Sequence, residues 1–429
     1  MLGKLRSGIA NNLLLKITSF NAISVGLQIL GGLITSKLIA IYLGERGMAL
    51  LGYLRNFMTT TQAAGNLGLS NGIVKYVATG DEEHHPLSKL LSTAVIVSLI
   101  ATIIVSTILY VGAAYFNTQI FGDEAQYTYV FKWLAIALPF ITLNGILLAV
   151  INGQSAYKKV VKIQIFSKLI GLAITILSII YYGVQGALVA LVVSPAVILM
   201  ITLVALGKEG SVLKSISFSK FDTGALRKLG SYTLMALFSM IVLPLVYIAI
   251  RREIGEGAGY WDAMTRVSDY YFKFVATLMT LYILPQLSKA TTSSAFRKEI
   301  FGFYKTILPL FGLGLLLIYF LRSFIVQLLF TEDFMPMTSL FKWQLLGDFV
   351  KVLSIIIAYQ FLAKKMFWHY ILTEAFLIII LYTTSVYFID LLDDVEGAVI
   401  AHFVSYTMYY GIILLIFGSS LFGLENQEN

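Results

Sequence analysis

Cysteine is absent from this chain of 429 residues, and charge is scarce, since only 13% of the residues are Asp, Glu, Lys or Arg. The missing thiols exclude disulfides, thiolate catalysis and cysteine-ligated metal. Histidine occurs four times, and no Walker sequence for binding nucleotide phosphates is present. We therefore expect that the chain is not an enzyme, has no catalytic residues, metal or other cofactor, and binds no nucleic acid.

Apolar residues make up 58% of the chain and fall in runs of about 20, the length that crosses a bilayer. No soluble domain of this size has such a composition. The pattern predicts an all-α integral membrane protein with about twelve transmembrane helices. The expected spans are roughly 17–43, 49–79, 90–114, 127–153, 160–182, 186–206, 228–252, 261–285, 300–321, 338–362, 367–389 and 395–422.

Basic residues are distributed unevenly over the expected loops. The N-terminus and every second loop carry 17 of the Lys and Arg residues, whereas the alternate loops carry only Arg46, Arg251, Arg252 and Arg322. Cytoplasmic loops of membrane proteins are enriched in Lys and Arg. We therefore expect both termini to lie in the cytoplasm.

Three short sequences recur at offsets of 207 to 211 residues. Because six spans is an even number, a duplicated six-span unit would enter the membrane the same way round twice and give parallel repeats. We expect an N-terminal lobe at 1–206, a cytoplasmic linker at 207–227 and a C-terminal lobe at 228–429. The recurring sequences are Phe131-Lys132-Trp133 with Phe341-Lys342-Trp343, Val184-Gln185-Gly186-Ala187 with Val395-Glu396-Gly397-Ala398, and Gly52-Tyr53 with Gly259-Tyr260.

Subtracting the 21 loop residues from the total of 31 basic residues leaves ten inside the expected spans, against four acids. Side chains near a membrane surface can extend to water, and Lys75, Lys168 and Lys305 have that simple explanation. Cations at greater depth need a partner or a wet cavity. The ten are Lys37, Arg55, Lys75, Lys132, Lys168, Arg266, Lys273, Lys305, Lys342 and Lys351, and the acids are Asp262, Asp269, Asp348 and Glu374.

Four charges lie on one face of the expected span 261–285. Asp262, Arg266, Asp269 and Lys273 follow one another at spacings of four, three and four, which stack along a helix. A charge at the bilayer centre costs about 2.5–3.5 kcal/mol, so this face cannot meet lipid. It lines a cavity for an anionic ligand, or Asp269 neutralises Arg266 or Lys273 within the protein.

Two further groups extend this hypothesis of a cationic cavity. Asp348 and Lys351 share a face of a later span, where they either bind a ligand or pair with each other. Lys37 and Arg55 have no acid in their own spans, so internal pairing does not account for them. Arginine suits phosphate because its planar fork binds two oxygens at once. His402 is expected to be a buried, hydrogen-bonded group rather than a ligand.

Several segments resemble a known family, the Wzx-type polysaccharide flippases of the MOP (multidrug, oligosaccharidyl-lipid, polysaccharide) exporter superfamily, with lipid III flippases as the nearest branch. They cover nearly the whole chain, and the longer ones are moderately specific. They are Ser36-Lys37-Leu38, Arg55, Asn71-Gly72, Val74 to Ala78, Thr233 to Leu237, Arg251, Ser268-Asp269, Tyr282 to Pro285, Trp343-Gln344-Leu345, Gly347-Asp348, Lys351 and Glu374.

The resemblance implies two six-helix lobes around a central cavity in a bacterial inner membrane. It implies an undecaprenyl-diphosphate-linked oligosaccharide as substrate, and polysaccharide polymerase and chain-length regulator proteins as partners. By position, the resemblance makes Lys37, Arg55, Lys75, Arg251 and Lys351 candidates for binding substrate, and Asp269, Asp348 and Glu374 candidates for a charge network. Arg266 and Lys273 are cavity candidates from the charge pattern alone, because the lipid III flippases have uncharged polar residues there.

Three other functions are open. A multidrug or cation antiporter on the same architecture should carry net acid in its cavity, whereas here basic residues outnumber acids ten to four. A membrane glycosyltransferase or polymerase would need a sizeable periplasmic loop, and the expected outer loops are short. A lipid II flippase is the third, and only the family resemblance distinguishes it from a flippase for lipid-linked oligosaccharides.

Overall fold

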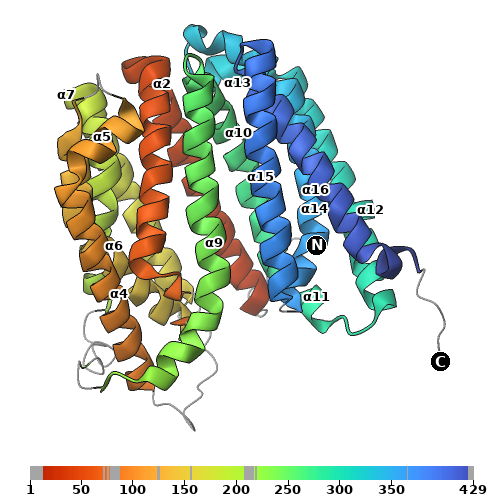
Figure 1. Ribbon diagram of the computed structural model, residues 1–429, viewed down its shortest axis with the longest axis horizontal. Helices are drawn as coiled ribbons and strands as arrows, with labels where there is room; N and C mark the ends of the chain where they lie inside the picture. Colours follow the sequence, from red (N-terminus) through yellow and green to blue (C-terminus); the bar gives the residue numbers. More distant parts are fainter. Residues whose placement is uncertain are drawn as a thin grey trace, which may run out of the picture. The chain divides into compact units, whose positions relative to one another are not determined.

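The computed structural model is helical throughout the part of the chain that it describes (Figure 1). It describes residues 13–70, 73–74, 77, 87–122, 126–154, 157–206, 217, 220–364 and 366–423, with side chains for all of these except 13–25, 87, 157–158, 225–236, 239, 280–281 and 285. Within these ranges, 8 helices are long and apolar enough to cross a membrane. The expected class, an all-helical membrane protein, is thus confirmed.

Contacts divide the chain into two compact units. Unit 1 comprises Met1–Leu38 and Tyr53–Leu245, and unit 2 comprises Ile39–Gly52 and Val246–Asn429. Two helices therefore contribute to both units, because the boundaries fall inside α2 (Leu13–Asn66) and α9 (Thr223–Ile254).

The remaining helices of unit 1 gather around α6, which packs against α4, α5 and α7. Its core includes Leu69, Leu91, Ile146 and Val150, which come from three segments of the chain. Long apolar runs form these helices because every backbone polar group must be satisfied within the segment in lipid. The bounds are α4 Leu87–Val111, α5 Ala113–Phe121, α6 Thr128–Gly153 and α7 Tyr157–Leu206.

Unit 2 is built around α14, which packs against α12 and α16, and α16 in turn packs against α15. Its core includes Ile283, Ile300, Ile356, Phe361 and Ile413. A π-helical turn, η3, continues α10 into α11, and a 3-10 turn, η4, precedes α14. The bounds are α10 Ala258–Leu278, η3 Met279–Ile283, α11 Leu284–Lys289, α12 Ser293–Phe320, α13 Arg322–Leu329, η4 Glu332–Ser339, α14 Phe341–Ala363, α15 Phe367–Leu392 and α16 Glu396–Phe422.

Glycine breaks the two longest helices near their middles. Gly44 divides the 54 residues of α2, with φ 64°, and Gly183 divides the 50 residues of α7, with φ 55°. Only glycine adopts this left-handed conformation without strain. At 1.5 Å per residue each helix is about 75–80 Å long, over twice the thickness of a bilayer core.

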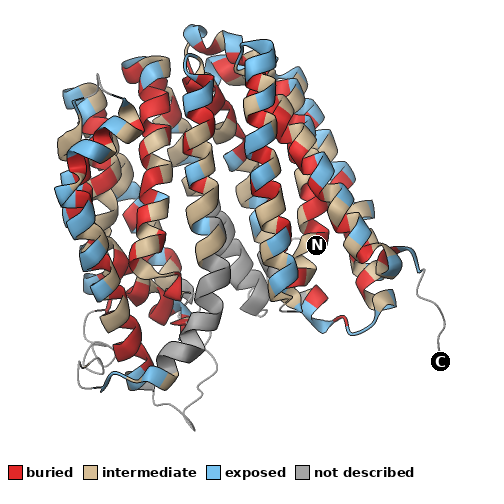
Figure 2. Ribbon diagram, in the orientation of Figure 1, coloured by how far each residue is buried: buried red, intermediate tan, exposed pale blue. Residues whose placement is uncertain are grey.

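Many large apolar side chains are exposed on the outer faces of the helices. Val204, Phe320 and Leu415 are 82%, 75% and 83% exposed. Figure 2 shows buried residues and exposed residues on different sides of the same helices. Exposure of this extent is unfavourable in water but suits a surface that faces acyl chains.

Three expected boundaries differ most from the structure. The span expected at 49–79 is interrupted, because α2 ends at Asn66 and the chain turns through Leu67 and Gly68 at positive φ. The span expected at 300–321 begins earlier, at Ser293, since Thr292 Oγ1 caps α12 by accepting from Ala295 N at 3.2 Å. The linker expected at 207–227 lies mostly outside the described residues, and α9 begins within it at Thr223.

Candidate functional site

Asp348 on α14 is fully buried and is the centre of a polar cluster in unit 2. Ser268 Oγ donates to its Oδ2 at 2.6 Å, and His402 Nε2 lies 2.9 Å from its Oδ1. Tyr271 donates through its hydroxyl and Gln344 through its amide nitrogen. Donors from α10, α14 and α16 thus surround one carboxylate, as its burial requires. The prediction that His402 is a buried, hydrogen-bonded group is confirmed.

Local sequence brings α14 close enough to α16 to form this cluster. Gln344 and Asp348 are four residues apart, so both lie on the same face of α14. Gly347 lies between them, and a Cβ there would collide with the His402 ring and come within 3.1 Å of the Phe403 backbone. A glycine at this position therefore permits the close approach on which the bond between Asp348 and His402 depends.

Lys351, three residues after Asp348, lies against aromatic rings. Its Nζ is 4.5 Å from the ring centre of Phe272 and 5.1 Å from that of Tyr406. Lys351 is half-buried, and such contacts contribute about 0.5–2 kcal/mol depending on how far the cation is desolvated. The sequence also allowed an ion pair between Lys351 and Asp348, but the structure pairs Asp348 with His402.

Arg251 and Asp262 form a buried ion pair. Arg251 lies in the last turn of α9 and is 2% exposed, and its Nη2 is 2.6 Å from Asp262 Oδ1. The guanidinium carbon also lies 5.1 Å from the ring centre of Trp261. Gly52 of α2 packs against the acid, because a Cβ there would collide with the Asp262 carboxylate. The sequence placed Arg251 in an outer loop; its expected role in binding substrate stays a prediction, and a ligand would have to displace Asp262.

The four charges expected on one helical face do share one helix, α10. Their environments differ: Asp262 is fully buried, Arg266 and Lys273 are half-buried, and Asp269 is exposed. Lys273 Nζ lies 5.3 Å from the ring centre of Tyr270. The charged face is therefore not uniform, since Asp262 at one end is buried in an ion pair and Asp269 in the middle is exposed.

The other candidates lie apart in the chain. Lys37 and Arg55 are half-buried on α2 and belong to unit 1, whereas Glu374 is half-buried on α15 of unit 2. Each of these three side chains has interactions with other residues. Lys75 lies outside the described residues. A cavity shared by Lys37, Arg55 and the cations of α10 stays a prediction.

Sequence reasoning missed the donors that hold Asp348. A buried carboxylate needs polar partners, and residues three or four positions away are the first place to look. Gln344 satisfies that spacing on α14 and was a usable signal. Tyr271 had no such signal, because it reaches Asp348 from a helix that is 77 residues away in sequence.

The charged side chains of the described residues are suited to ligand binding and proton uptake. Within those residues, no group of three or more His, Asp or Glu side chains could hold a metal ion. Half-buried Lys and Arg can bind phosphate oxygens, and a buried carboxylate can accept a proton.

Membrane-crossing helices with charged clusters buried between them define this chain as a membrane protein of the transporter class. The chain belongs to the polysaccharide biosynthesis protein family, whose family model matches residues 14–291. It is 28% identical to the lipid III flippases of Escherichia coli (strain K12) and Shigella flexneri over 409 residues, which cover 94% of this chain and 98% of each relative. The expected family resemblance is thus confirmed, and these relatives are flippases rather than enzymes.

Solved structures show the same fold at low sequence identity. An inward-facing MATE-family multidrug resistance transporter of the MOP superfamily has a TM-score of 0.76 at 12% identity, covering 95% of this chain and 96% of the transporter. The lipid II flippase MurJ, in an inward closed conformation, has a TM-score of 0.70 at 15% identity, covering 94% of this chain and 87% of the flippase. These likenesses establish the fold but do not distinguish the substrates.

Proposed function

We propose that this chain is a flippase that moves an undecaprenyl-diphosphate-linked oligosaccharide, an O-antigen or lipid III-like unit, from the cytoplasmic to the periplasmic leaflet of a bacterial inner membrane. The observation that carries this proposal is the similarity to lipid III flippases along 94% of the chain. Such a substrate joins a hydrophobic polyprenyl tail to a charged, sugar-bearing head group. The head group cannot cross the hydrocarbon core of the bilayer without a protein. The product would pass to polysaccharide polymerase and chain-length regulator proteins.

The proposed chain crosses the membrane twelve times, and the lengths of the helices support this number. The 8 candidate spans include the two glycine-broken helices, and each of those two is long enough for two crossings, which makes ten. The helix α9 supplies one more, and the continuous segment α10–η3–α11 supplies the twelfth. The charges on α10 make its inclusion depend on a wet or paired environment, as proposed for the transport path.

The two lobes, 1–206 and 228–429, are proposed to be parallel repeats that rock about a central cavity, joined by the cytoplasmic linker 207–227. The recurring sequences support this, since matched residues of the first pair have the same burial. Phe131 and Phe341, which begin two of the copies, are both fully buried, and the lysine after each is exposed.

In this mechanism the cations bind the diphosphate while the tail stays in lipid. Arginine would grip two phosphate oxygens, and lysine would supply a compact charge. As the lobes rock, the head group would leave one set of Lys and Arg contacts and form another. Asp269, Asp348 and Glu374 form the proposed charge network, with protonation as the means of coupling. The proposed substrate-binding residues are Lys37, Arg55, Lys75, Arg251, Arg266, Lys273 and Lys351.

Two alternative functions share the fold. A multidrug or cation antiporter is disfavoured by the excess of basic residues in the spans, ten against four acids. A lipid II flippase would use the same phosphate chemistry and differs in its glycan. Efflux of ethidium by cells that express the chain would support the first, and rescue of cells depleted of their lipid II flippase would support the second.

The decisive test removes one cation in cells in which this chain is the only flippase for its glycan. Arg55→Gln is expected to lower glycan export at least tenfold at an unchanged membrane level, whereas Arg55→Lys keeps the charge and retains part of the activity. Lys132→Gln is the matched control, because Lys132 is exposed near the start of α6. Full export by Arg55→Gln would contradict a role in binding phosphate.

A further inference from the structure

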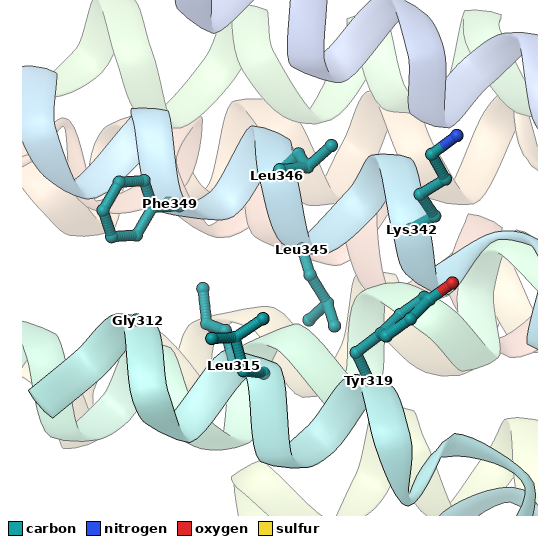
Figure 3. Close-up of a pocket in the computed structure, with 8 residues that line it drawn as sticks. Gly312, Leu315, Tyr319, Lys342, Leu345, Leu346 and Phe349 are labelled. Carbon is teal, nitrogen blue, oxygen red and sulfur yellow. The ribbon is translucent and has the colours of Figure 1, made fainter. Parts of the chain in front are cut away.

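An apolar groove of about 450 Å³ runs between α12 and α14 of unit 2 (Figure 3). Its walls are Leu315 and Leu316 from α12, and Leu345, Leu346 and Phe349 from α14. Leu316 and Leu346 are also among the exposed large side chains, at 55% and 43%. The groove therefore opens on the outer surface of the helices, where a molecule can enter sideways from the bilayer.

One end of the groove is polar and cationic. Tyr319 and Lys342 line that end, as Figure 3 shows. Arg322 reaches the same place, because its Nη1 donates to the Tyr319 carbonyl at 2.9 Å and its guanidinium carbon lies 4.5 Å from the Tyr319 ring centre. Lys342 Nζ lies 4.7 Å from the ring centre of Trp343. Within the described part of the chain, neither Lys342 nor Arg322 forms an ion pair with a carboxylate.

The groove extends over about two thirds of the depth of one leaflet. The helix α12 ends at Phe320 and α14 begins at Phe341, so the cationic end lies at a membrane surface. From there the groove follows α12 inward to Gly312, about 10 Å at 1.5 Å per residue. Half of a bilayer core is about 15 Å thick. A charged head and an acyl chain of the same leaflet would thus meet the two parts of the groove together.

We propose that this groove binds an anionic glycerophospholipid, with one acyl chain between α12 and α14 and the phosphate between Lys342 and Arg322. Charge complementarity selects the anionic head, because Arg322 contacts Tyr319, which lines the groove together with Lys342, and among the described residues neither cation is paired with a carboxylate. The tyrosine and tryptophan rings beside them suit the same interfacial depth. This site is independent of the proposed substrate path and carries none of its residues.

The test uses the purified full-length protein in detergent, titrated with dioleoylphosphatidylglycerol or dioleoylphosphatidylcholine, with bound lipid counted by native mass spectrometry. One phosphatidylglycerol is expected to bind at least fivefold more tightly than phosphatidylcholine. Lys342→Ala and Arg322→Ala should each weaken phosphatidylglycerol about fivefold, as expected for one interfacial charge, and leave phosphatidylcholine nearly unchanged. Lys132→Ala, in the matching sequence of unit 1, should change neither.

A second pair of variants tests the apolar part. Leu316→Trp should fill the groove and abolish binding of both lipids, whereas Leu313→Trp, which is 63% exposed on the same helix but outside the groove lining, should not. Equal binding of the two lipids, or equal effects of Lys342→Ala and Lys132→Ala, would overturn the proposal. So would undecaprenyl phosphate that excludes phosphatidylglycerol from the site at equal concentration.

Discussion

The described residues of the two units offer a comparison between buried polar bonds. In unit 1, a buried bond joins the neutral side chains of Thr202 and Asn144 at 2.6 Å. In unit 2, a buried bond joins the ionisable side chains of Asp348 and His402 at 2.9 Å. Neutral pairs already hold membrane helices together, and a buried ion pair is weak proof of a stabilising role. In the proposed mechanism, the ionisable groups of unit 2 therefore serve more than packing.

The recurring sequences sharpen this comparison position by position. At the offset of 210 residues that relates Phe131 to Phe341, the counterparts of Gln344 and Asp348 are Leu134 and Leu138. Both leucines are fully buried in α6. A helix in this register thus packs well with an apolar face, and the polar cluster is an addition specific to α14.

Backbone features, in contrast, are common to both copies. Gly186 follows the break in α7, and a Cβ there would collide with the Ser178 carbonyl. Gly397 follows the turn between α15 and α16, and a Cβ there would collide with the Phe388 carbonyl. The same tight reversal recurs in each unit, so the copies share their geometry while their buried chemistry differs.

The largest effect is expected from breaking the buried ion pair of unit 2. Arg251→Met leaves Asp262 without its guanidinium and should lower the free energy of unfolding by about 3–5 kcal/mol. Replacing both partners, as Arg251→Met with Asp262→Leu, should recover most of that loss. Unfolding in mixtures of detergent and SDS measures both. A double variant as unstable as the single one would show that the pair is needed for packing.

The next effect concerns the acid that unit 1 lacks. Asp348→Leu copies the residue found at the matching position of α6 and removes the acceptor of His402 and Ser268, so about 2–3 kcal/mol of stability should be lost. Asp348→Asn keeps an oxygen acceptor and should lose less than about 1 kcal/mol. If export fails in Asp348→Asn while stability is kept, the cluster serves function; intact export would remove Asp348 from the proposed charge network.

Substitution of the glycine at each chain reversal, Gly186 in α7 and Gly397 before α16, should lower stability by a similar amount. Gly186→Ala and Gly397→Ala each push a methyl group into a backbone carbonyl, which should cost about 1–3 kcal/mol. Gly171→Ala and Gly411→Ala are matched controls on α7 and α16, because no atom lies within 4 Å of a Cβ at either place. The same unfolding titration compares the four. Unequal effects at Gly186 and Gly397 would weaken the case for a repeat.

The smallest effect is expected in unit 1. Thr202→Val removes the donor to Asn144 while keeping the side-chain shape, and should cost about 1 kcal/mol in the unfolding titration. Export should stay normal, in contrast to Asp348→Asn. A loss of export at unchanged stability would place this neutral pair in the transport path as well.

Much of the fold was predictable because bilayer thickness fixes the length of apolar helices. Three expected spans agree with the structure to within three residues at both ends. They are 127–153, 367–389 and 395–422, which correspond to α6, α15 and α16. The start of α12 was missed, since its first turns are polar and stay helical outside the apolar run. The extension of α12 beyond its apolar run depends on the cap at Thr292 rather than on hydropathy.

The candidate site was less predictable because its bonds join distant segments. Spacing along one helix predicted which charges share a face of α10, but not that Asp262 would pair with Arg251 across the turn from α9. Spacing also did not predict that Asp348 would bond to His402 and not to the nearby Lys351, because His402 lies 54 residues further along the chain. Such choices depend on helix packing, and the local signs of it are the glycines at the contacts, Gly347 against His402 and Gly52 against Asp262.

The proposed transport itself is tested most directly by locating the substrate. The protein is depleted from cells, and a membrane-impermeant glycan label applied to spheroplasts reports how much undecaprenyl-diphosphate-linked oligosaccharide faces the periplasm. We predict that this fraction falls sharply while the total lipid-linked oligosaccharide rises, and that expression of the wild-type chain reverses both changes. An unchanged periplasmic fraction after depletion would contradict the proposal that this chain is the flippase.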